Sequence, residues 1–508
     1  MEVHDERNNV ASMLWSTASR HPDKPAVVER SRSATYAELR GRAAGIANAL
    51  VREGLVAGDR VGILLDRGID PVAAYFGVLA AGGIVVMLNP TLKPRQIEYA
   101  LDHSGAKLFL TSQEITGRLH RFPETTAGVL PIGAIAETGE TEPVRLEASD
   151  IAQITFTSGS TGLPKGVVAT HGNVWAAIRT VVDYLGLESQ DRIAGLLPLS
   201  GVYGANQMLG SVMIGATLVV PASPLMNQVA AELRETETTV LAAVPPLWAQ
   251  LLQAPGFSAT PMPSLRILQN AGGHLAPAVV KRLRETQPQA RLFLQYGMTE
   301  VFRSTFLPPE ELDRRPDSMG KPMRDAEILV LREDLTPCDV GEVGELVHAG
   351  PTVTRGYWRD PERTAAAFRP HPLRPDTEVA VFSGDMVRRD EDGFLYYVSR
   401  RDRMIKTLGF RVGPDEVMDV LYASGQIIDG LVTSEPDPQR GDAIVAYVVL
   451  SEEGSLKGLT AYARVELPRY MQPTRIEIRG ELPRNPNGKH DLRALREERR
   501  LAETADQA

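Results

Sequence analysis

The sequence has little cysteine, no excess of positive charge and no long apolar run, and each shortage excludes a class of protein. Its 508 residues contain one cysteine, Cys338, which cannot form an internal disulfide, so we expect a reducing compartment. The formal net charge is −9, whereas a general nucleic-acid surface needs a basic face. The apolar runs at residues 75–88 and 209–220 are shorter than the roughly 20 residues that cross a bilayer. The N-terminus is charged and lacks the apolar segment of a signal peptide, so we expect a cytoplasmic protein with no membrane span and no nucleic-acid partner.

Metal-binding and thiol patterns are also scarce. The nine histidines show no close metal-ligand spacing, and with a single cysteine a zinc site is not expected. Cys338 is a conceivable catalytic thiol, but its surroundings, "LTPCDVGE", favour a small residue in a surface turn.

Helical and strand patterns alternate over most of the chain. Residues 35–54 and 70–83 carry apolar residues at helical spacing and end in glycine, while residues 59–65 and 84–88 are short apolar runs typical of buried strands. This alternation predicts parallel sheet with helices on its faces. We therefore expect an α/β fold: a large N-terminal domain of parallel-rich sheets with helices, and a small, mobile α+β C-terminal domain.

The domain boundary is placed where the composition changes. Residues 254–264 and 369–378 are rich in proline and are expected to be connections. After a predicted strand at residues 392–400 the chain becomes highly charged, and a compact α+β pattern follows. The predicted domains are residues 1–401 and 402–508.

One loop concentrates small and polar residues between two predicted strands. "TFTSGSTGLPKG", residues 155–166, combines three glycines with hydroxyl side chains and one lysine. Glycines let main-chain N–H groups turn toward one object, and the hydroxyls of Thr157, Ser158, Ser160 and Thr161 add donors. With the charge of Lys165, the array suits a phosphate-bearing ligand.

Two other loop types do not fit this string. A Walker-type phosphate loop has Gly-Lys-Ser/Thr running into a helix, whereas Lys165 lies between Pro164 and Gly166 and a strand pattern follows. A Gly-x-Ser-x-Gly nucleophile elbow does not fit either.

The loop resembles the phosphate-binding signature of the adenylate-forming enzymes, which include acyl-CoA synthetases, aryl-CoA ligases, adenylation domains of peptide synthetases and luciferases. Four further segments resemble family motifs in the family's order: "QYGMTE" (295–300), "SGD" (383–385), "SRRDRMIKTLGFRVGPDEV" (399–417) and "LPRNPNGKHDLRAL" (482–495). The chain looks most like bacterial AMP-forming acyl-CoA ligases, including those found beside secondary-metabolite genes. Over the N-terminal third the resemblance is one of general pattern only.

The resemblance implies an ATP site. Glu300 would hold Mg²⁺, Thr299 would contact the α-phosphate, and Asp385 would accept the ribose hydroxyls. The full set of residues expected to contact the nucleotide is Thr157, Ser158, Gly159, Ser160, Thr161, Gly162, Lys165, Gly272, Gly273, Gln295, Tyr296, Gly297, Asp385 and Arg400.

The resemblance also implies a mobile lid that serves two half-reactions. Lys489 would enter the site for adenylation, and removal of such a preorganised charge costs about 3–4 kcal/mol in the barrier. Rotation at the hinge residue Asp402 would then present the face that carries Lys406 and Gly409.

The acid pocket is expected around four segments. The residues expected to line it are Ser200, Gly201, Tyr203, Gly204, Val244, Pro245, Gly272 and His274. Ser200 and Gly201 stand where many relatives have Phe and His, which should widen or reshape the entrance. Residues 200–207 contain no aspartate to pair an ammonium group, which counts against an α-amino acid, so we expect an apolar acyl or aryl acid.

The expected activity is that of an AMP-forming acid–thiol ligase with ATP, Mg²⁺ and coenzyme A. Two other acceptors stay open: a carrier-protein phosphopantetheine, and an amine that would give an amide directly. A binding-only relative is a further alternative, but such a protein would be expected to lose Lys489 or Glu300, and both are present.

Overall fold

The fold was determined from a computed structural model. It describes residues 8–30, 32–119, 121–135, 138–157, 164–223, 225–401, 405–407, 410–437, 441–485, 490–492, 494–495 and 497–498. The chain divides into two compact units: Met1–Leu275, Lys281–Ile328 and Val347–Phe382 form the first, and Ala276–Val280, Leu329–Leu346 and Ser383–Ala508 form the second. The boundary expected between residues 401 and 402 falls inside the second unit. Because Asp402 lies outside the described residues, a hinge there stays a prediction.

A nine-stranded sheet occupies the centre of the first unit, in the order β15-β14-β13-β12-β11-β9-β10-β1-β2. Its strands are β1 (Pro25–Glu29), β2 (Ser33–Thr35), β9 (Arg192–Ala194), β10 (Thr217–Val220), β11 (Val240–Ala243), β12 (Ile267–Asn270), β13 (Arg291–Tyr296), β14 (Thr305–Leu307) and β15 (Lys321–Pro322). The six neighbouring strands β13, β12, β11, β9, β10 and β1 pair in parallel. Antiparallel pairs stand only at the two edges, where β2 pairs with β1, and β14 pairs with β13 and β15. The parallel centre places the carboxyl ends of β11, β12 and β13 at one edge, where ligands bind in α/β sheets.

A second sheet of the first unit has the order β6-β5-β3-β4-β7-β8. Its strands are β3 (Arg60–Leu64), β4 (Ile84–Met87), β5 (Ala106–Thr111), β6 (Gly128–Pro131), β7 (Ile151–Thr157) and β8 (Lys165–Thr170). Only β7 and β8 pair antiparallel, so the strands that flank the glycine-rich loop form a hairpin.

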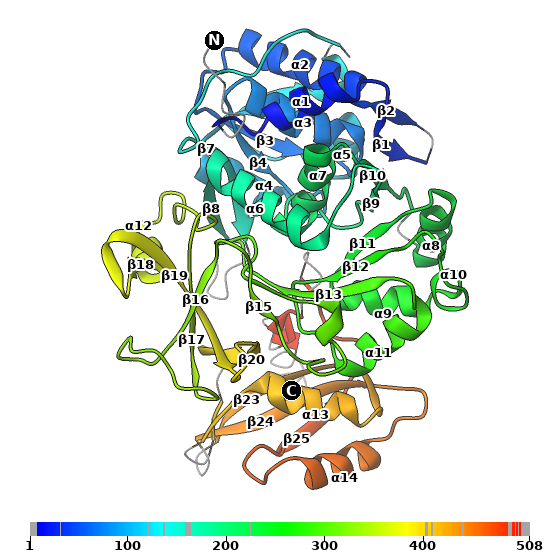
Figure 1. The fold of residues 1–508 in the computed structure, drawn as a ribbon, viewed down its shortest axis with the longest axis vertical. Helices are drawn as coiled ribbons and strands as arrows, with labels where there is room; N and C mark the ends of the chain where they lie inside the picture. Colours follow the sequence, from blue (N-terminus) through cyan, green and yellow to red (C-terminus); the bar gives the residue numbers. More distant parts are fainter. Residues whose placement is uncertain are drawn as a thin grey trace. The chain divides into compact units, whose positions relative to one another are not determined.

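Helices pack against these sheets and bury the apolar faces of the sheets (Figure 1). Helix α2 (Tyr36–Arg52) begins at Thr35, whose hydroxyl accepts the N–H of Glu38 in a capping box, and it packs on α3 (Ile69–Ala80). Both contribute to one large buried apolar cluster. The other helices of three or more residues in this unit are α1 (Ser12–Arg20), α4 (Pro94–Ser104), α5 (Gln113–Arg118), η2 (Ile132–Ala134), α6 (His171–Leu185), α7 (Val202–Ile214), α8 (Met226–Glu235), α9 (Pro245–Gln253), α10 (Pro255–Ser258), η3 (Pro309–Glu311) and α12 (Pro361–Ala367); α11 (Pro277–Thr286) follows β12.

The two proline-rich connections contain regular structure. Residues 254–264 include the short helix α10, with Pro255 in its first turn, where proline is tolerated. Residues 369–378 overlap the strands β18 (Phe368–His371) and β19 (Arg374–Arg389), which pair antiparallel. Strand β18 lies at the edge of a five-stranded sheet of order β16-β17-β19-β18, in which β16 is Glu327–Leu331, β17 is Val343–Ala349 and β20 (Leu395–Arg400) pairs with β19. An edge strand accommodates Pro370 because one side of its backbone needs no partner, so the expected connection was wrong here.

The end of the chain forms a small α+β arrangement (Figure 1). Its sheet has the order β22-β21-β24-β23, with β25 on β24. The elements are β21 (Ile405–Thr407), β22 (Phe410–Val412), α13 (Pro414–Ala423), β23 (Ile427–Asp437), β24 (Gly441–Leu450), α14 (Leu456–Glu466) and β25 (Arg475–Ile478). Helix α13 packs on β23 and α14 on β25, around a separate buried cluster. A large α/β part and a small α+β part confirm the expected fold class.

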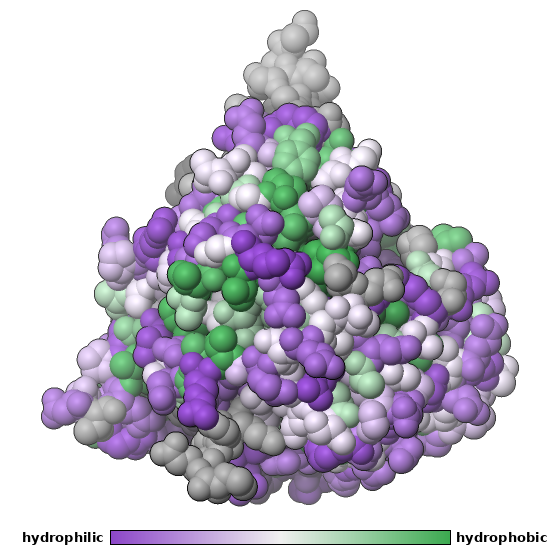
Figure 2. Space-filling view, turned by 90° about the horizontal axis from the view of Figure 1, so that it is seen from above, coloured by the Kyte–Doolittle hydropathy of each residue, from purple (hydrophilic) through white to green (hydrophobic). Residues whose placement is uncertain are grey.

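The face shown in Figure 2 mixes hydrophilic residues with separate hydrophobic patches. Within the described part of the chain, no helix combines the length and apolar character needed to cross a membrane.

Candidate active site

Lys165 stands at the base of the β7–β8 hairpin. Thr157 and Lys165 face each other as the last residue pair before the loop, and the Thr157 hydroxyl donates to the Lys165 carbonyl at 3.5 Å. The expected phosphate-binding residues Ser158, Gly159, Ser160, Thr161 and Gly162 lie outside the described residues, so their roles stay predictions. The strand that follows Lys165 agrees with the exclusion of a Walker-type loop.

Lys165, Glu300 and Tyr357 converge on one point. Lys165 Nζ donates to Glu300 Oε1 at 3.0 Å and to the Tyr357 hydroxyl at 2.6 Å, and that hydroxyl donates to Glu300 Oε1 at 2.6 Å. The ammonium also lies 4.2 Å from the centre of the Tyr357 ring, which adds a cation–π attraction. The structure thus brings together two of the expected site residues and adds Tyr357, which the sequence did not single out.

Tyr357 is positioned by a backbone contact that local sequence patterns do not predict. It forms an isolated antiparallel bridge with Val167 in β8, two residues from Lys165. The segment that carries it, "RGYWRDPERT", shows an aromatic pair before a proline, but a bridge between residues this far apart has no signature in one sequence.

Glu300 is kept ionised in a buried place. It is 9% exposed, and burial alone would raise the pKa of its carboxyl. The charge of Lys165 and the hydrogen bonds from Tyr357 and Lys165 outweigh burial, so the pKa of Glu300 lies below its usual value. An ionised carboxylate of this kind suits a hard cation.

The loop between β13 and β14 holds Glu300 in a tight backbone. Ser304 N–H donates to the Tyr296 carbonyl at 2.9 Å and closes the loop, and half-buried Thr299 precedes Glu300 within it. Phe302 adopts a φ of 61°, a left-handed conformation that is rare for a bulky residue. A Cβ on Gly297 would lie 2.4 Å from the Phe302 carbonyl oxygen, so the turn requires glycine there. Backbone strain of this kind persists where the surrounding structure holds it, often at functional sites.

The carboxyl ends of β11 and β12 bring two expected pocket segments together. A Cβ on Gly272, whose φ is 81°, would lie 3.2 Å from Val244 Cγ1, and one on Gly273 would lie 3.2 Å from Pro245 Cγ. His274 follows as an exposed residue. The structure thus brings these expected pocket residues together, and their role in binding the acid stays a prediction.

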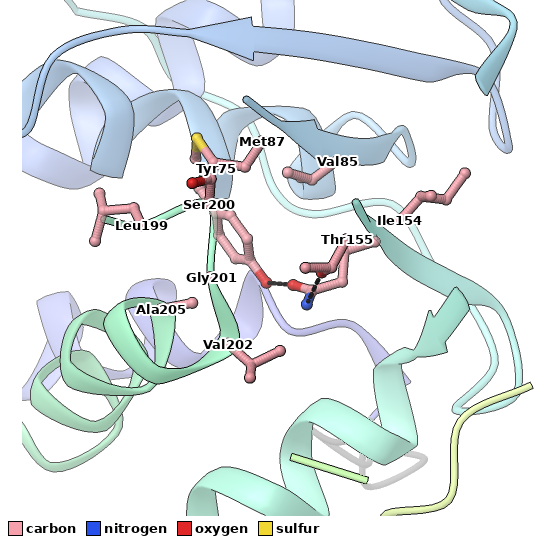
Figure 3. A pocket seen from close by; sticks show the side chains of 11 residues that line it. Tyr75, Val85, Met87, Ile154, Thr155, Leu199, Ser200, Gly201, Val202 and Ala205 are labelled. Atoms are coloured by element: carbon pink, nitrogen blue, oxygen red, sulfur yellow. Dashed lines mark hydrogen bonds between the residues drawn. The ribbon is translucent and has the colours of Figure 1, made fainter. Parts of the chain in front are cut away.

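Ser200 and Gly201 line a small cavity (Figure 3). Its polar side is a hydrogen-bonded chain: the Tyr75 hydroxyl donates to Gln153 Oε1 at 2.6 Å, and Gln153 Nε2 donates to Thr155 Oγ1 at 3.2 Å. The residues that line the cavity are Tyr75, Val85, Met87, Gln153, Ile154, Thr155, Leu199, Ser200, Gly201, Val202 and Ala205. The first turn of α7 therefore meets side chains of α3, β4 and β7, which the sequence did not assign to the pocket.

Tyr203 and Gly204, which follow in α7, lie against residues that do not line this cavity. The Tyr203 hydroxyl donates to the Gln269 carbonyl at 2.8 Å, and a Cβ on Gly204 would lie 2.1 Å from the Pro198 carbonyl oxygen. Gln269 also joins Gln207 and Gln295 through side-chain hydrogen bonds of 3.4 Å. Buried amides thus form a network beside the expected pocket residue Tyr203.

Asp385 and Arg400, in the second unit, form an ion pair. They face each other across the β19–β20 pair, and Arg400 Nη1 donates to Asp385 Oδ1 at 3.1 Å. Gly384, with a φ of 72°, donates its N–H to Glu345 at 2.9 Å, which fixes the turn before Asp385. The structure therefore pairs the two residues expected at the ribose and phosphates.

Three expected functional residues have no described side chain. Lys489 and Asp402 lie outside the described residues, and of Lys406 only the backbone in β21 is described. Their roles stay predictions.

Among the described residues, one group offers three metal-ligand atoms, from Glu327, His371 and Glu378, within 4.8 Å of one another. Arg374 binds both carboxylates, at 2.8 Å for Glu378, and thereby supplies the positive charge that a metal would bring. We interpret the group as an ion-pair network. Burial raises the pKa of the Cys338 thiol, the opposite of what a catalytic thiolate needs.

Comparison with known proteins identifies relatives over nearly the whole chain. The family model described as "AMP-binding enzyme" matches residues 14–358, and that of the "AMP-binding enzyme C-terminal domain" matches residues 416–489. The chain is 32% identical over 471 residues to 2-succinylbenzoate–CoA ligase of Geobacillus kaustophilus (strain HTA426), covering 91% of this chain and 93% of the ligase. It is 28% identical over 497 residues to tyrocidine synthase 1 of Brevibacillus parabrevis; the match covers 96% of this chain, which spans less than half, 45%, of that synthase.

A solved structure has the same fold. The o-succinylbenzoate coenzyme A synthetase of Bacillus subtilis, in complex with ATP and magnesium ion, superposes with a TM-score of 0.82 and 27% identity, covering 94% of this chain and 98% of that one.

Proposed function

The chain belongs to the AMP-binding enzyme family, and from this premise we propose that it is an ATP-dependent ligase that activates a carboxylic acid and transfers the acyl group to the thiol of coenzyme A. The observation that carries the proposal is the Lys165–Glu300 pair, which unites a phosphate-loop cation with an ionised carboxylate. Both residues lie within motifs that resemble those of adenylate-forming enzymes, and the relatives include a CoA ligase by name.

The first half-reaction forms a mixed anhydride. A carboxylate oxygen attacks the α-phosphorus of ATP in line, the bond from that phosphorus to the bridging oxygen breaks, and pyrophosphate leaves with the electron pair. Negative charge gathers on the phosphate oxygens in the transition state, so positioning and positive charge account for most of the catalysis. The hydroxyl and amide donors of the loop and the ammonium of Lys165 supply both.

The ion pair at the hairpin base fits a Mg²⁺–triphosphate ligand. Entry of the phosphates gives Lys165 a new anionic partner and leaves the Glu300 carboxylate, still held by Tyr357, to face a cation. One ionised carboxylate beside phosphate oxygens is the donor set that Mg²⁺ prefers, and when bound the ion would neutralise phosphate charge. In this proposal Asp385 accepts the ribose hydroxyls and Arg400 contacts the ribose or phosphates.

The second half-reaction transfers the acyl group. The thiol sulfur attacks the acyl carbonyl carbon, the bond to the AMP oxygen breaks, and AMP leaves as the thiol proton is released. We assign Lys489 to adenylation, Asp402 to the hinge between the proposed domains 1–401 and 402–508, and the segment with Lys406 and Gly409 to the transfer step. An exchange of lid faces separates the two chemistries in time.

An acceptor comparison tests the proposal. Purified protein is given ATP, Mg²⁺ and a panel of acyl and aryl acids, and pyrophosphate is measured; coenzyme A, a phosphopantetheine-bearing carrier protein and a set of amines are then added in parallel and the products identified by mass spectrometry. A thioester of coenzyme A supports the ligase. Acyl transfer to the carrier protein alone, or amide without thiol, replaces it with the corresponding alternative, and absence of pyrophosphate with every acid contradicts activation altogether.

A further inference from the structure

Arg303 is a buried cation that the proposed chemistry does not use. It lies at the base of the β13–β14 loop and is 2% exposed. Its Nη1 makes one long hydrogen bond, 3.4 Å, to the Phe302 carbonyl, while Nε and Nη2 have no hydrogen-bond partner among the described residues. Arginine keeps its charge in proteins, and burial of an unpaired charge is strongly unfavourable. The site therefore calls for an anionic partner.

The surroundings of Arg303 contain aromatic rings in place of a carboxylate. Its guanidinium carbon lies 4.5 Å from the centre of the Tyr203 ring. Burial raises the pKa of Tyr203 far above its usual value and that of Tyr184 to about 12, and the nearby charge of Arg303 offsets this in part. Both rings are thus neutral, and within the described part of the chain no acidic side chain forms an ion pair with Arg303. The Tyr184 hydroxyl also makes no hydrogen bond to Nε or Nη2 of Arg303.

The two unpartnered nitrogens define the shape of the missing partner. Nε and Nη2 lie on the same edge of the planar guanidinium, so their N–H bonds run side by side. This edge is the one that binds both oxygens of a carboxylate in a bidentate pair. A carboxylate satisfies both donors and the charge at once, which a water molecule or a carbonyl cannot do.

Other buried polar atoms near the same strand ends also lack partners. Gln295 Oε1, at the end of β13, and Asn270 Oδ1, at the end of β12, have none among the described residues, and neither has the amide of Asn206 in α7. These residues are at most 6% exposed. Buried polar groups are normally hydrogen-bonded, so these atoms beside the expected pocket residue Tyr203 are available to a polar ligand or to water.

We propose that Arg303, stacked on Tyr203, binds a second carboxylate of the acid substrate, remote from the one that is activated. This inference rests on the proposed function. It replaces the apolar acyl or aryl acid expected from the sequence with an acyl or aryl acid that carries a second carboxylate. Glu300, Lys165 and Tyr357 are hydrogen-bonded to one another. Arg303 follows Glu300 by three residues, and among the described residues no hydrogen bond or ion pair joins Arg303 to any of the three. In this proposal the β13–β14 loop serves two sites: Glu300 faces the magnesium–triphosphate, and Arg303 binds the second carboxylate of the acid.

Matched acid pairs test the inference. Pyrophosphate release is measured with glutarate and pentanoate, adipate and hexanoate, and isophthalate and benzoate, for the wild type and for the variants Arg303→Met and Arg303→Lys. For at least one pair, the wild type is expected to prefer the dicarboxylate by about 10²- to 10³-fold in kcat/KM. Arg303→Met abolishes the preference and changes kcat/KM for the monocarboxylate by less than about threefold, while Arg303→Lys, which keeps the charge without the fork, retains part of the preference. Arg291→Met, which removes an exposed arginine over Phe293 at the other end of β13, leaves the preference intact.

Thermal stability separates recognition from a structural role. Without substrate, Arg303→Met is expected to melt at the wild-type temperature or above, since it removes an unpaired buried charge. A clearly lower melting temperature for both Arg303 variants would show that Arg303 serves packing and would overturn the inference. Equal use of monocarboxylates and dicarboxylates by the wild type overturns it too, although pyrophosphate release then still supports the proposed function. No pyrophosphate with any acid overturns both.

Discussion

Glu300 accepts a hydrogen bond from Lys165 at 3.0 Å although 135 residues separate the two along the chain. Neither residue needs the other for its local structure, since one begins a strand and the other lies in a loop. Their meeting places an ionised carboxylate beside an ammonium, and in the proposed function a magnesium–triphosphate complex would exchange partners with both.

Replacement of Glu300 by glutamine tests this relationship. Glu300→Gln keeps the shape and removes the charge, so we expect ATP–pyrophosphate exchange to fall by about 10²- to 10³-fold. The residual activity should need more Mg²⁺, because an amide is a weaker ligand than a carboxylate. Exchange is measured over a range of Mg²⁺ concentrations.

The control for this variant is Glu232→Gln in α8, another buried glutamate, which accepts the Ala222 N–H at 2.9 Å. It should keep its exchange rate and Mg²⁺ dependence. Wild-type kinetics in Glu300→Gln would remove the carboxylate from the proposed role.

The hydroxyl of Tyr357 is expected to support catalysis through Glu300. Tyr357→Phe removes one of the hydrogen bonds that hold the pKa of Glu300 low, so the pKa should rise and the acid limb of the pH–rate profile should move upward. We expect a loss of about 1 kcal/mol in stability and an approximately tenfold loss of exchange. Tyr396→Phe, which removes a tyrosine–carboxylate hydrogen bond of 3.0 Å to Asp390, is the matched control and should leave the profile unchanged. An unshifted profile in Tyr357→Phe would speak against the coupling.

Asp385 is expected to recognise the ribose. If both of its oxygens accept ribose hydroxyls, the wild type should use ATP better than 2′-deoxy-ATP, and Asp385→Asn should raise the KM for ATP and reduce that discrimination. Steady-state kinetics with both nucleotides measures it. Asp390→Asn alters a carboxylate in the turn that joins β19 to β20 and should discriminate as the wild type does. Full discrimination in Asp385→Asn would place the ribose elsewhere.

Two buried histidines predict a loss of stability in mild acid. Burial lowers the pKa of His348 to about 3 and that of His171 to about 4, whereas an unfolded histidine titrates near 6.5. The folded state therefore favours the neutral imidazoles. Their contribution to the free energy of unfolding is fully present above about pH 6.5 and is lost as the pH falls toward the pKa of the folded state. Each histidine can add about 1.4 kcal/mol per pH unit to the slope of unfolding free energy against pH in that window.

His348→Gln checks the assignment. His348 Nδ1 lies 2.9 Å from the Ser304 hydroxyl and Nε2 lies 3.1 Å from that of Thr352, so the variant should be less stable than the wild type at pH 7.5. Its stability should nevertheless fall less steeply between pH 6.5 and 4.5, as followed by chemical denaturation. A slope equal to that of the wild type would show that His348 does not titrate there.

Local pattern predicted the elements well and the long-range contacts poorly. The strand, loop and strand around the glycine-rich segment appear as β7 and β8, because apolar runs and glycines act within a few residues. The expected connection at residues 369–378 failed because proline is tolerated in an edge strand, and a single sequence does not show which strand is an edge. Tyr357 and Arg303 were missed for the same reason: the significance of each depends on a partner distant in sequence, Lys165 in one case and Tyr203 in the other.

Oxygen tracing tests the central claim most directly. The protein is incubated with ATP, Mg²⁺, an accepted acid labelled with ¹⁸O in its carboxylate, and coenzyme A, and the products are analysed by mass spectrometry. Attack of the carboxylate on the α-phosphorus predicts one ¹⁸O in AMP and none in pyrophosphate. Label in inorganic phosphate or pyrophosphate, with AMP unlabelled, would contradict an acyl-adenylate and with it the account of how Lys165 and Glu300 are used.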